Sequence, residues 1–337
     1  MEKKVKAIGL LSGGLDSVLA AKLILDQGIE VEAINFVTVF CNCTSKGSTC
    51  LASQKAAEQL NIPLKVVDIS EEYLDIVKKP KYGYGSGMNP CLDCRIFIFK
   101  KARRYMEESG SSFIFTGEIL GQRPMSQRKD AINTIERDSG LRGFIVRPLS
   151  AKLFPPTVAE EYRLVDRSKF LAISGRSRKI QISLAKEFGI RHYSCPSGGC
   201  LLTDSGFSRR MKDLLKHKPD FDLADVNLLK YGRHFRFSPE MKLVIGRDER
   251  ENDMIVTLKR EGDVVFSAEE PKGPTAILRG ASNGEFVKEA ASIIARYALG
   301  KDRYDEAKIK YFRHPKDGHS YLKAKPFDDA ILARLRI

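Results

Sequence analysis

A serine- and glycine-rich segment close to the amino terminus, Leu-Leu-Ser-Gly-Gly-Leu-Asp-Ser, has the residue types that bind a phosphate chain. Gly13 and Gly14 let backbone N–H groups approach an anion closely, and a helix that starts directly afterwards adds its positive end. Ser12 and Ser17 can donate hydroxyl hydrogen bonds, and Asp16 can hold a magnesium ion against the phosphates. We therefore predict a phosphate-binding site here. The alternative is a plain glycine-rich turn with a Ser/Asp helix cap.

Two cysteine-containing segments form the second group of reactive residues. Cys91 and Cys94 form a Cys-x-x-Cys motif at the start of a predicted helix, which brings two sulfurs together where the helix dipole lowers the pKa of a thiol. Much later the chain has Cys195-Pro-Ser-Gly-Gly-Cys200. Three thiolates from the two segments can hold a 4Fe-4S cluster that leaves one iron open. A buried set of inert cysteines is the alternative.

Three more cysteines follow the second predicted strand, namely Cys41, Cys43 and Cys50. A zinc site with Cys195 as fourth ligand, a sulfur-relay role and a structural thiol cluster all remain open for them. Because the chain has seven cysteines, an odd number, they cannot form a fully paired disulfide framework.

The elements that must position these residues alternate in the first half of the chain. Short apolar runs predict strands, and runs with helical spacing predict the helices between them. The expected strands are residues 4–11, 29–40, 64–69, 113–117 and 144–147, and the expected helices are residues 17–27, 48–60 and 95–109. This order predicts an α/β fold of the Rossmann type, a parallel twisted sheet with helices on both faces.

The second half of the chain changes character twice. We expect a basic helical segment over residues 156–238, with Arg-rich helices at 163–179 and 207–218. Short strands and one long helix follow, which predict a separate small α+β module. The expected domains are therefore residues 1–155, 156–238 and 239–337.

The composition of the chain indicates which partners it could bind and in which cellular compartment it works. The 337 residues include 57 Lys and Arg against 43 Asp and Glu, a net charge of +14, which favours a polyanion as partner or substrate. No apolar run reaches the roughly 18 residues of a membrane span, and the amino terminus has no signal-peptide core. We expect a cytoplasmic protein without a membrane partner.

The glycine-rich segment resembles the SGGxDS motif of the PP-loop ATP pyrophosphatases, or adenine nucleotide alpha hydrolases. The resemblance implies a site for ATP and magnesium at Ser12, Gly13, Gly14, Asp16 and Ser17. It also implies cleavage of ATP between the alpha and beta phosphates, with adenylation of a carbonyl oxygen and release of pyrophosphate. The fold it implies is the same Rossmann-type sheet.

A second resemblance narrows the substrate. The Asn-Pro-Cys-Leu-Asp-Cys-Arg stretch around Cys91 and Cys94 is similar to the Asn-Pro-x-x-x-Cys-Asn stretch of the tRNA 2-thiouridylases. The Gly-Cys-Leu around Cys200 matches their second essential cysteine. The resemblance implies that Cys91, Cys94 and Cys200 ligate a 4Fe-4S cluster, with Cys195 as an alternative third ligand, and that Cys94, Cys200 and Asp16 are catalytic. Gly117 stands in the family's nucleotide-contacting Thr-Gly-His, where this chain has Glu118 in place of His.

A third resemblance covers roughly residues 240–325. The stretch Val-Ile-Gly-Arg-Asp-Glu-Arg-Glu-Asn-Asp at 244–253 resembles the opening of the NFACT RNA-binding domain. The match departs at 263–267, where that family's Asp-x-Trp-Phe-His strand is replaced by Asp-Val-Val-Phe-Ser. The resemblance implies RNA binding, with tRNA as the partner.

Together these features predict an ATP-dependent tRNA sulfurtransferase that adenylates a uridine carbonyl and replaces its oxygen with sulfur, with 2-thiouridine favoured. The sulfur donor is open between inorganic sulfide, a cysteine desulfurase and a carrier, and a homodimer is also open. The alternatives are 4-thiouridine synthesis, a PP-loop amidotransferase or sulfurtransferase for a small molecule, and a non-catalytic RNA-binding protein.

Overall fold

The structure, a computed structural model, describes residues 5–42, 51–194, 199–280, 284–300, 305–313 and 318–337. The chain divides into two compact units, Met1–Asp204 (unit 1) and Ser205–Ile337 (unit 2). No helix within the described ranges is both long enough and apolar enough to cross a bilayer.

Unit 1 is built on a parallel sheet that has five strands within the described residues, in the order β3-β2-β1-β4-β5. The order places β1, the first strand of the chain, at the centre of the sheet, as a Rossmann-type arrangement requires. This confirms the predicted fold class. The strands are β1 (Lys6–Leu10), β2 (Glu30–Val37), β3 (Leu64–Asp68), β4 (Phe113–Thr116) and β5 (Ile145–Val146).

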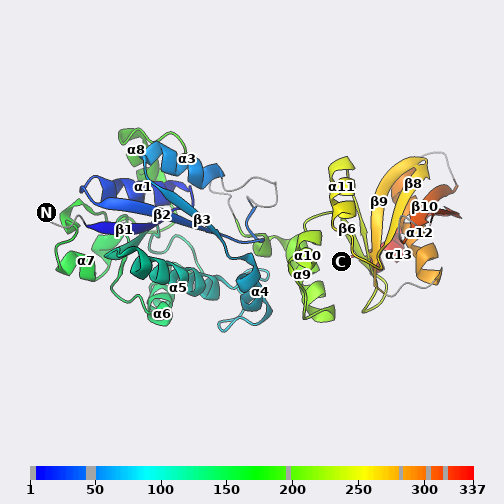
Figure 1. Cartoon of the computed structure of the whole chain (residues 1–337), viewed down its shortest axis with the longest axis horizontal. Coiled ribbons are helices and arrows are strands. Elements are labelled where there is room, and N and C mark those ends of the chain that lie inside the picture. The colour runs from blue at the N-terminus through cyan, green and yellow to red at the C-terminus, as the bar shows by residue number, and fades with distance from the viewer. Residues whose placement is uncertain (1–4, 43–50, 195–198, 281–283, 301–304, 314–317) are drawn as a thin grey trace. The chain divides into compact units, whose positions relative to one another are not determined.

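Helices cover both faces of this sheet, because successive residues of a strand point to opposite sides. Ala7 of β1 packs in one core cluster with Ala56 and Ala185, whereas its neighbour Ile8 packs in another with Phe99 and Ile135. One face carries α1 (Leu15–Leu25), α3 (Leu51–Leu60) and α8 (Lys179–Glu187), and the other carries α5 (Cys91–Ser109) and α6 (Lys129–Ser139), as Figure 1 shows. The shorter α4 (Ser70–Lys78) precedes α5.

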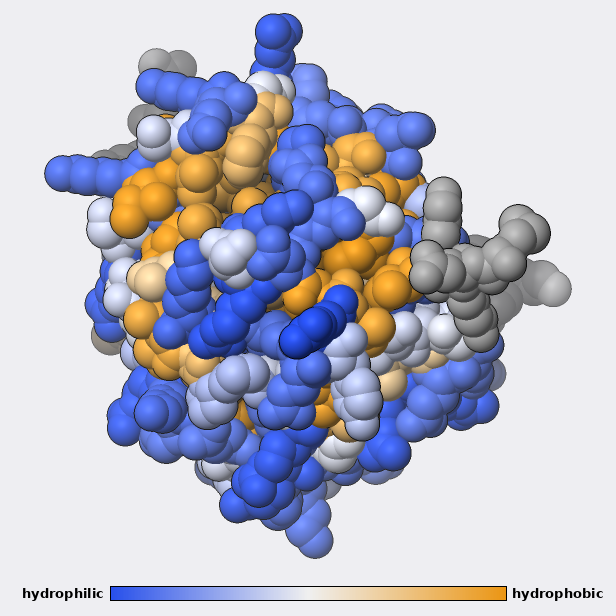
Figure 2. All heavy atoms as spheres, turned by 90° about the vertical axis from the view of Figure 1, so that its left-hand side faces the viewer, coloured by the Kyte–Doolittle hydropathy of each residue, from blue (hydrophilic) through white to orange (hydrophobic). Residues whose placement is uncertain are grey.

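The amino-terminal ends of these strands lie at the end of unit 1 where the chain begins (Figure 1). Figure 2 faces this end and shows hydrophilic side chains interleaved with smaller apolar areas. The predicted site residues follow the carboxyl ends of the strands, at the opposite edge of the sheet, which is where ligands bind in open α/β sheets.

The expected basic helix at 163–179 is wrong. Helix α7 (Val158–Glu161) stops because Arg163 adopts a positive φ of 53°, which an α-helix cannot include. A 3₁₀ turn, η2 (Arg167–Lys169), lies between α7 and α8. Two further 3₁₀ turns are η1 (Ala151–Leu153), before α7, and η3 (Leu201–Thr203), after α8. The Arg167 guanidinium donates to the carbonyl oxygens of Ala151 and Phe154, so this arginine fastens the fold of unit 1.

Unit 2 contains an antiparallel sheet that has six strands in its described residues, in the order β11-β10-β8-β9-β7-β6. Helix α12 (Gly284–Leu299) buries its apolar side on one face, and α11 (Glu249–Thr257) contributes Ile255 to a cluster on the other. The predicted strands and long helix are confirmed. The strands are β6 (Arg233–Arg236), β7 (Lys242–Ile245), β8 (Val264–Glu270), β9 (Lys272–Arg279), β10 (Ala307–Phe312) and β11 (Ser320–Ala324).

Three further helices belong to unit 2. These are α9 (Ser205–His217), α10 (Leu223–Leu228) and α13 (Asp329–Leu335). The expected basic helix at 207–218 is therefore present as α9, and Arg236 of β6 joins it to the sheet through an ion pair with Asp213.

Candidate active site

The glycine-rich segment forms a tight loop between β1 and α1. Gly13 has a φ of +77°, and a Cβ atom there would lie 2.4 Å from the carbonyl carbon of Ala52, so glycine is required for both reasons. Gly14 caps α1, and a Cβ on it would come no closer than 3.5 Å to a neighbouring atom, the Ser12 Oγ. The loop therefore presents backbone amides at a helix amino terminus, which is suited to an anion.

Asp16 lies in the first turn of α1 and is only 9% exposed. Its Oδ2 accepts a hydrogen bond from Gln122 Nε2 at 3.1 Å and lies 3.5 Å from an Arg178 Nη. Its buried Oδ1 has no hydrogen-bond partner among the described residues. A buried carboxylate oxygen without a partner fits a magnesium ligand, since magnesium binds through carboxylate oxygens.

The end of β4 packs directly against this turn. A Cβ on Gly117 would lie 2.4 Å from the backbone nitrogen of Ser17, so only glycine allows the two segments to approach. Ser17 in turn donates its hydroxyl hydrogen to the Gly14 carbonyl oxygen at 2.8 Å, and its Oγ lies 3.3 Å from Ser12 Oγ. The five predicted loop residues and Gly117 thus form one site.

The cysteine-bearing segments return to this edge of the sheet. Ser194, just before the second cysteine segment, donates its N–H to the Gly13 carbonyl oxygen at 2.8 Å. Leu201, just after Cys200, donates to the Phe40 carbonyl oxygen at 2.9 Å, and Met88 donates to the Leu202 carbonyl oxygen at 2.9 Å. Backbone hydrogen bonds therefore connect the second cysteine segment to the loop, to the end of β2 and to the approach to α5.

Four half-buried thiols meet here in the described part of the chain. The Cys91 and Cys94 thiols occupy the first turn of α5, and the thiols of Cys41, Cys91 and Cys94 all interact electrostatically with Cys200. Cys43, Cys50 and Cys195 lie outside the described residues. No three or more Cys, His, Asp or Glu side chains among those described are placed to hold a metal ion. The donor chemistry fits a cluster, because thiolates are its usual ligands, but their positions do not form a ready-made metal site.

The expectation that the helix dipole lowers the thiol pKa values is wrong for this arrangement. Burial raises the pKa of Cys94 to about 11 and that of Cys200 to about 12, and it raises the pKa of Cys91 as well. Burial also raises the pKa of Tyr73, whose hydroxyl hydrogen-bonds Cys94. Desolvation of a sulfur outweighs the helix dipole, which sequence alone could not show.

The guanidinium of Arg123 lies near both the cysteine pair and the glycine-rich loop. Arg123 is within electrostatic range of the Cys91 thiol and of the Asp16 carboxylate. The loop that carries it is held by Gln127, whose Oε1 accepts the Arg123 N–H at 3.0 Å. The cysteine pair therefore lies near the glycine-rich loop of residues 12–17 (the phosphate loop), at the same edge of the sheet.

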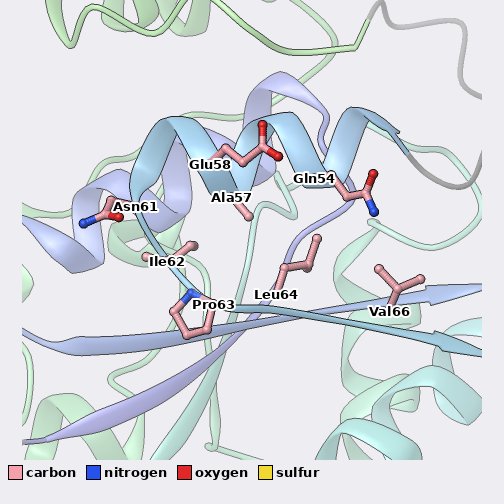
Figure 3. A pocket seen from close by; sticks show the side chains of 8 residues that line it. All are labelled: Gln54, Ala57, Glu58, Asn61, Ile62, Pro63, Leu64 and Val66. Carbon is pink, nitrogen blue, oxygen red and sulfur yellow. The ribbon is translucent and has the colours of Figure 1, made fainter.

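Sequence reasoning missed two contributors to this site, Tyr73 and Arg178. Tyr73 is 1% exposed in α4, and its position in the sequence gave no sign of a role; Arg178 was counted only among the basic residues of 163–179. Both reach the site through contacts between segments far apart in the chain. A separate hollow of about 520 Å³ lies between α3 and β3 (Figure 3), and no predicted site residue lines it.

The stretch of unit 2 that resembles the opening of the NFACT domain, residues 244–253, builds a structural turn. Asp248 caps α11 by accepting the Glu251 N–H at 2.9 Å, and Asn252 Oδ1 accepts the Thr275 N–H at 3.0 Å. A Cβ on Gly246 would lie 2.1 Å from that same Asn252 oxygen. These motif residues hold β7, α11 and β9 together.

Comparisons with known proteins match two separate parts of the chain, one in unit 1 and one in unit 2. Residues 5–137 match the family model described as tRNA methyl transferase HUP domain, and residues 232–335 match the one described as NFACT protein RNA binding domain. Together with the curated relatives, these matches confirm the resemblances to the PP-loop tRNA thiolases and to the NFACT domain.

The chain is also similar to curated tRNA-specific 2-thiouridylases, over part of their length. The tRNA-specific 2-thiouridylase of Syntrophotalea carbinolica is 34% identical over 34% of this chain, which covers 35% of that protein. That of Rippkaea orientalis is 28% identical over 68% of this chain, which covers 64% of the relative. The chain thus spans about a third to two thirds of the length of these relatives.

The similarity to solved structures is weak. The U34-tRNA thiolase NcsA of Methanococcus maripaludis, with its 4Fe-4S cluster, is 20% identical, with 68% of this chain and 71% of that chain covered, at a TM-score of 0.34. This score is too low to support an inference about shared chemistry.

Proposed function

We propose that this chain is an ATP-dependent tRNA sulfurtransferase, because residues 5–137 match the tRNA methyl transferase HUP domain, residues 232–335 match the NFACT protein RNA binding domain, and the curated relatives are tRNA-specific 2-thiouridylases. The observation that carries the proposal is the common edge of the sheet at which the phosphate loop lies with the thiols of Cys91, Cys94 and Cys200. A site for phosphates beside a group of sulfurs suits a reaction that activates an oxygen and then replaces it with sulfur.

The phosphate loop would bind ATP with magnesium. Backbone amides at the start of α1 and the Ser12 hydroxyl would stabilise the charge that develops on the pyrophosphate leaving group, and Ser17, which donates its hydroxyl hydrogen to the Gly14 carbonyl oxygen, would keep the loop in shape. Asp16 would hold the magnesium ion through its free Oδ1, while Gln122 and Arg178 fix Oδ2. Gly117 would keep β4 close enough for the nucleotide to bridge both segments.

Adenylation makes the later exchange feasible. The oxygen of a uridine carbonyl is a poor leaving group, and AMP departs readily, so transfer of AMP to that oxygen lets a sulfur nucleophile displace it. The proposal favours C2 of uridine because the sequence matches lie with 2-thiouridylases. Reaction at C4 would be 4-thiouridine synthesis.

The cysteines would hold the group that binds the sulfur before its transfer. We assign Cys91, Cys94 and Cys200 as the residues that would hold a 4Fe-4S cluster. When bound, such a cluster supplies an open iron that can bind sulfide. The chain itself positions the thiols: α5 presents Cys91 and Cys94 on one turn, and Tyr73 holds the Cys94 sulfur by a hydrogen bond. Sulfide, a cysteine desulfurase or a carrier would supply the sulfur.

Unit 2 would contribute RNA affinity. Arg209, Lys212 and Lys216 of α9 are exposed, and their spacing of three and four places them on one side of the helix. A row of positive charges of this kind suits a phosphate backbone.

The test is an anaerobic assay with ATP, magnesium, sulfide and tRNA, in which AMP, pyrophosphate and thiolated nucleosides are measured. We expect AMP formation that depends on tRNA, and 2-thiouridine in the digested RNA. Asp16→Asn should slow the formation of AMP by roughly 10²-fold or more, which is the usual effect of losing one electrostatic contact to charge that develops in the transition state. Asp26→Asn, at the exposed end of the same helix, is the matched control and should be unchanged.

Three results would count against the proposal. AMP formation without tRNA would favour an enzyme for a small molecule, and nucleotide binding without turnover would favour a non-catalytic RNA-binding protein. For the cluster, Cys91→Ala should lose bound iron and the visible absorption band but still bind ATP. Full iron content in that variant would overturn the ligand assignment.

A further inference from the structure

Cys41 lies among the thiols of the site, and the proposed function gives it no role. It follows the end of β2, where the Thr38 N–H donates to its Sγ at 3.3 Å and the Thr38 Oγ1 lies 3.5 Å from the same sulfur. The side chain is thus held in place by the backbone turn that follows the strand. It is half-buried.

The backbone places Cys41 directly opposite Cys200. The two residues form an isolated antiparallel bridge. The Leu201 N–H donates to the Phe40 carbonyl oxygen at 2.9 Å, so the flanking residues make the hydrogen bond and the two cysteines form a non-hydrogen-bonded pair. In such pairs the Cα atoms lie about 4.5 Å apart and the side chains approach each other more closely than in hydrogen-bonded pairs.

That geometry meets the requirement for a disulfide, whose Cα atoms are usually about 4.4–6.8 Å apart. The Cys41 thiol also interacts electrostatically with Cys200. Cys94 also interacts with Cys200, but it lies on α5 and its sulfur is hydrogen-bonded by Tyr73. Within the described residues, Cys41 is the cysteine whose backbone is paired with that of Cys200.

We propose that Cys41 and Cys200 form a reversible disulfide that removes the Cys200 thiol from the site, so that the pair is a redox-controlled modification site. The regulatory part of this proposal rests on the proposed function, because it takes Cys200 as a residue of sulfur transfer. The bond itself rests on the backbone pairing alone.

A low-molecular-weight disulfide is the oxidant. One cysteine thiolate attacks a sulfur of the external disulfide, which forms a mixed disulfide and releases one thiol. The second cysteine then attacks the protein sulfur of that mixed disulfide and releases the second thiol. The two protein thiols lose two electrons and two protons, and the external disulfide becomes two thiols. A dithiol reductant reverses both steps.

The experiment uses the full-length protein freed of iron, equilibrated with glutathione buffers from reduced to oxidised and then alkylated and digested without reduction. We expect a crosslinked pair of peptides containing Cys41 and Cys200, absent in Cys41→Ser and in Cys200→Ser and retained in Cys91→Ser. A Cys94–Cys200 crosslink in its place, or free Cys41 and Cys200 at the most oxidising ratio, would overturn the assignment.

A second measurement separates this inference from the proposed function. Under reducing conditions Cys41→Ser should thiolate tRNA as the parent does, and it should resist inhibition by oxidised glutathione. Loss of thiolation by Cys41→Ser under reducing conditions would overturn the regulatory role. If the crosslink forms but no variant or parent thiolates tRNA, the proposed function fails, and the regulatory role fails with it, while the disulfide stands.

Discussion

Glu118 is the charged residue that secures the first turn of α5. Its carboxylate, 2% exposed, accepts hydrogen bonds from Arg95 Nε at 3.0 Å and from Arg147 Nε at 3.1 Å. Burial opposes its ionisation, but the two guanidinium groups outweigh burial and hold the pKa of Glu118 below its ordinary value. Because Arg95 directly follows Cys94, this network fixes the position of the cysteine pair against β4 and β5.

Removing this charge should destabilise the protein strongly. Glu118→Gln leaves the buried Arg147 and its neighbour Arg95 without their shared carboxylate, and we expect a loss of about 3–5 kcal/mol in the free energy of unfolding. Urea unfolding at pH 7 measures it. Glu107→Gln, which removes an exposed partner of Arg103, should cost less than about 1 kcal/mol. A similar small effect for both variants would contradict the role of Glu118.

The same network predicts a pH dependence. Since the pKa of Glu118 is lower in the folded state, its stabilising effect is fully present above the ordinary value of 4.5 and is lost as the pH falls through the folded pKa. The difference in unfolding free energy between the parent and Glu118→Gln should therefore shrink as the pH falls from 5 towards 3. A difference that stays constant over this range would show that Glu118 does not act through its charge.

At the scale of elements, the phosphate loop depends on how closely α3 packs against it. Gly13 and Gly28 both have positive φ, 77° and 75°, but an added Cβ would meet nothing within 4 Å at Gly28, whereas at Gly13 it would lie 2.4 Å from Ala52. We expect Gly28→Ala to cost about 1–2 kcal/mol, the usual cost of a left-handed residue with a Cβ. Gly13→Ala should cost more and also weaken ATP binding, because α3 must move. Urea unfolding and calorimetric ATP titration check this, and equal effects of the two substitutions would contradict it.

Local patterns predicted most elements of the fold. The five parallel strands were visible as short apolar runs, and the Cys-x-x-Cys at the start of α5 was placed correctly. The basic stretch before α8 was misjudged, because its composition suits a helix and the positive φ of Arg163 is a tertiary outcome. Helix α11 was missed, since its Asp248 cap sits inside a stretch that was interpreted only as an RNA-binding motif.

Spacing along the chain predicted the local parts of the site, and the resemblance to the 2-thiouridylases added the distant Cys200 to Cys91 and Cys94. The loop residues and the cysteines are recognisable by type and spacing. The Tyr73–Cys94 hydrogen bond, the Arg178–Asp16 ion pair and the Cys41–Cys200 bridge join segments that lie far apart in the chain. No local sequence pattern predicts such contacts, because they depend on the order of the strands in the sheet and on which loops come back to the same edge.

For the whole molecule, the proposed function together with the net charge of +14 predicts a strongly salt-dependent affinity for tRNA. Replacing Arg209, Lys212 and Lys216 of α9 with alanine should weaken binding and reduce the slope of log K against log salt by about 3 if each contacts a phosphate. Replacing Lys100, Arg103 and Arg104 of α5 is the charge-matched control. Filter binding across a salt series measures both, and equal slopes would remove α9 from the RNA-binding surface.

The central claim, that the chain thiolates tRNA, is tested most directly by mass spectrometry of tRNA nucleosides from cells with and without the gene. The account predicts that one thiolated uridine disappears on deletion, returns with the parent gene and does not return with Asp16→Asn. An unchanged content of every thiolated nucleoside after deletion would contradict it.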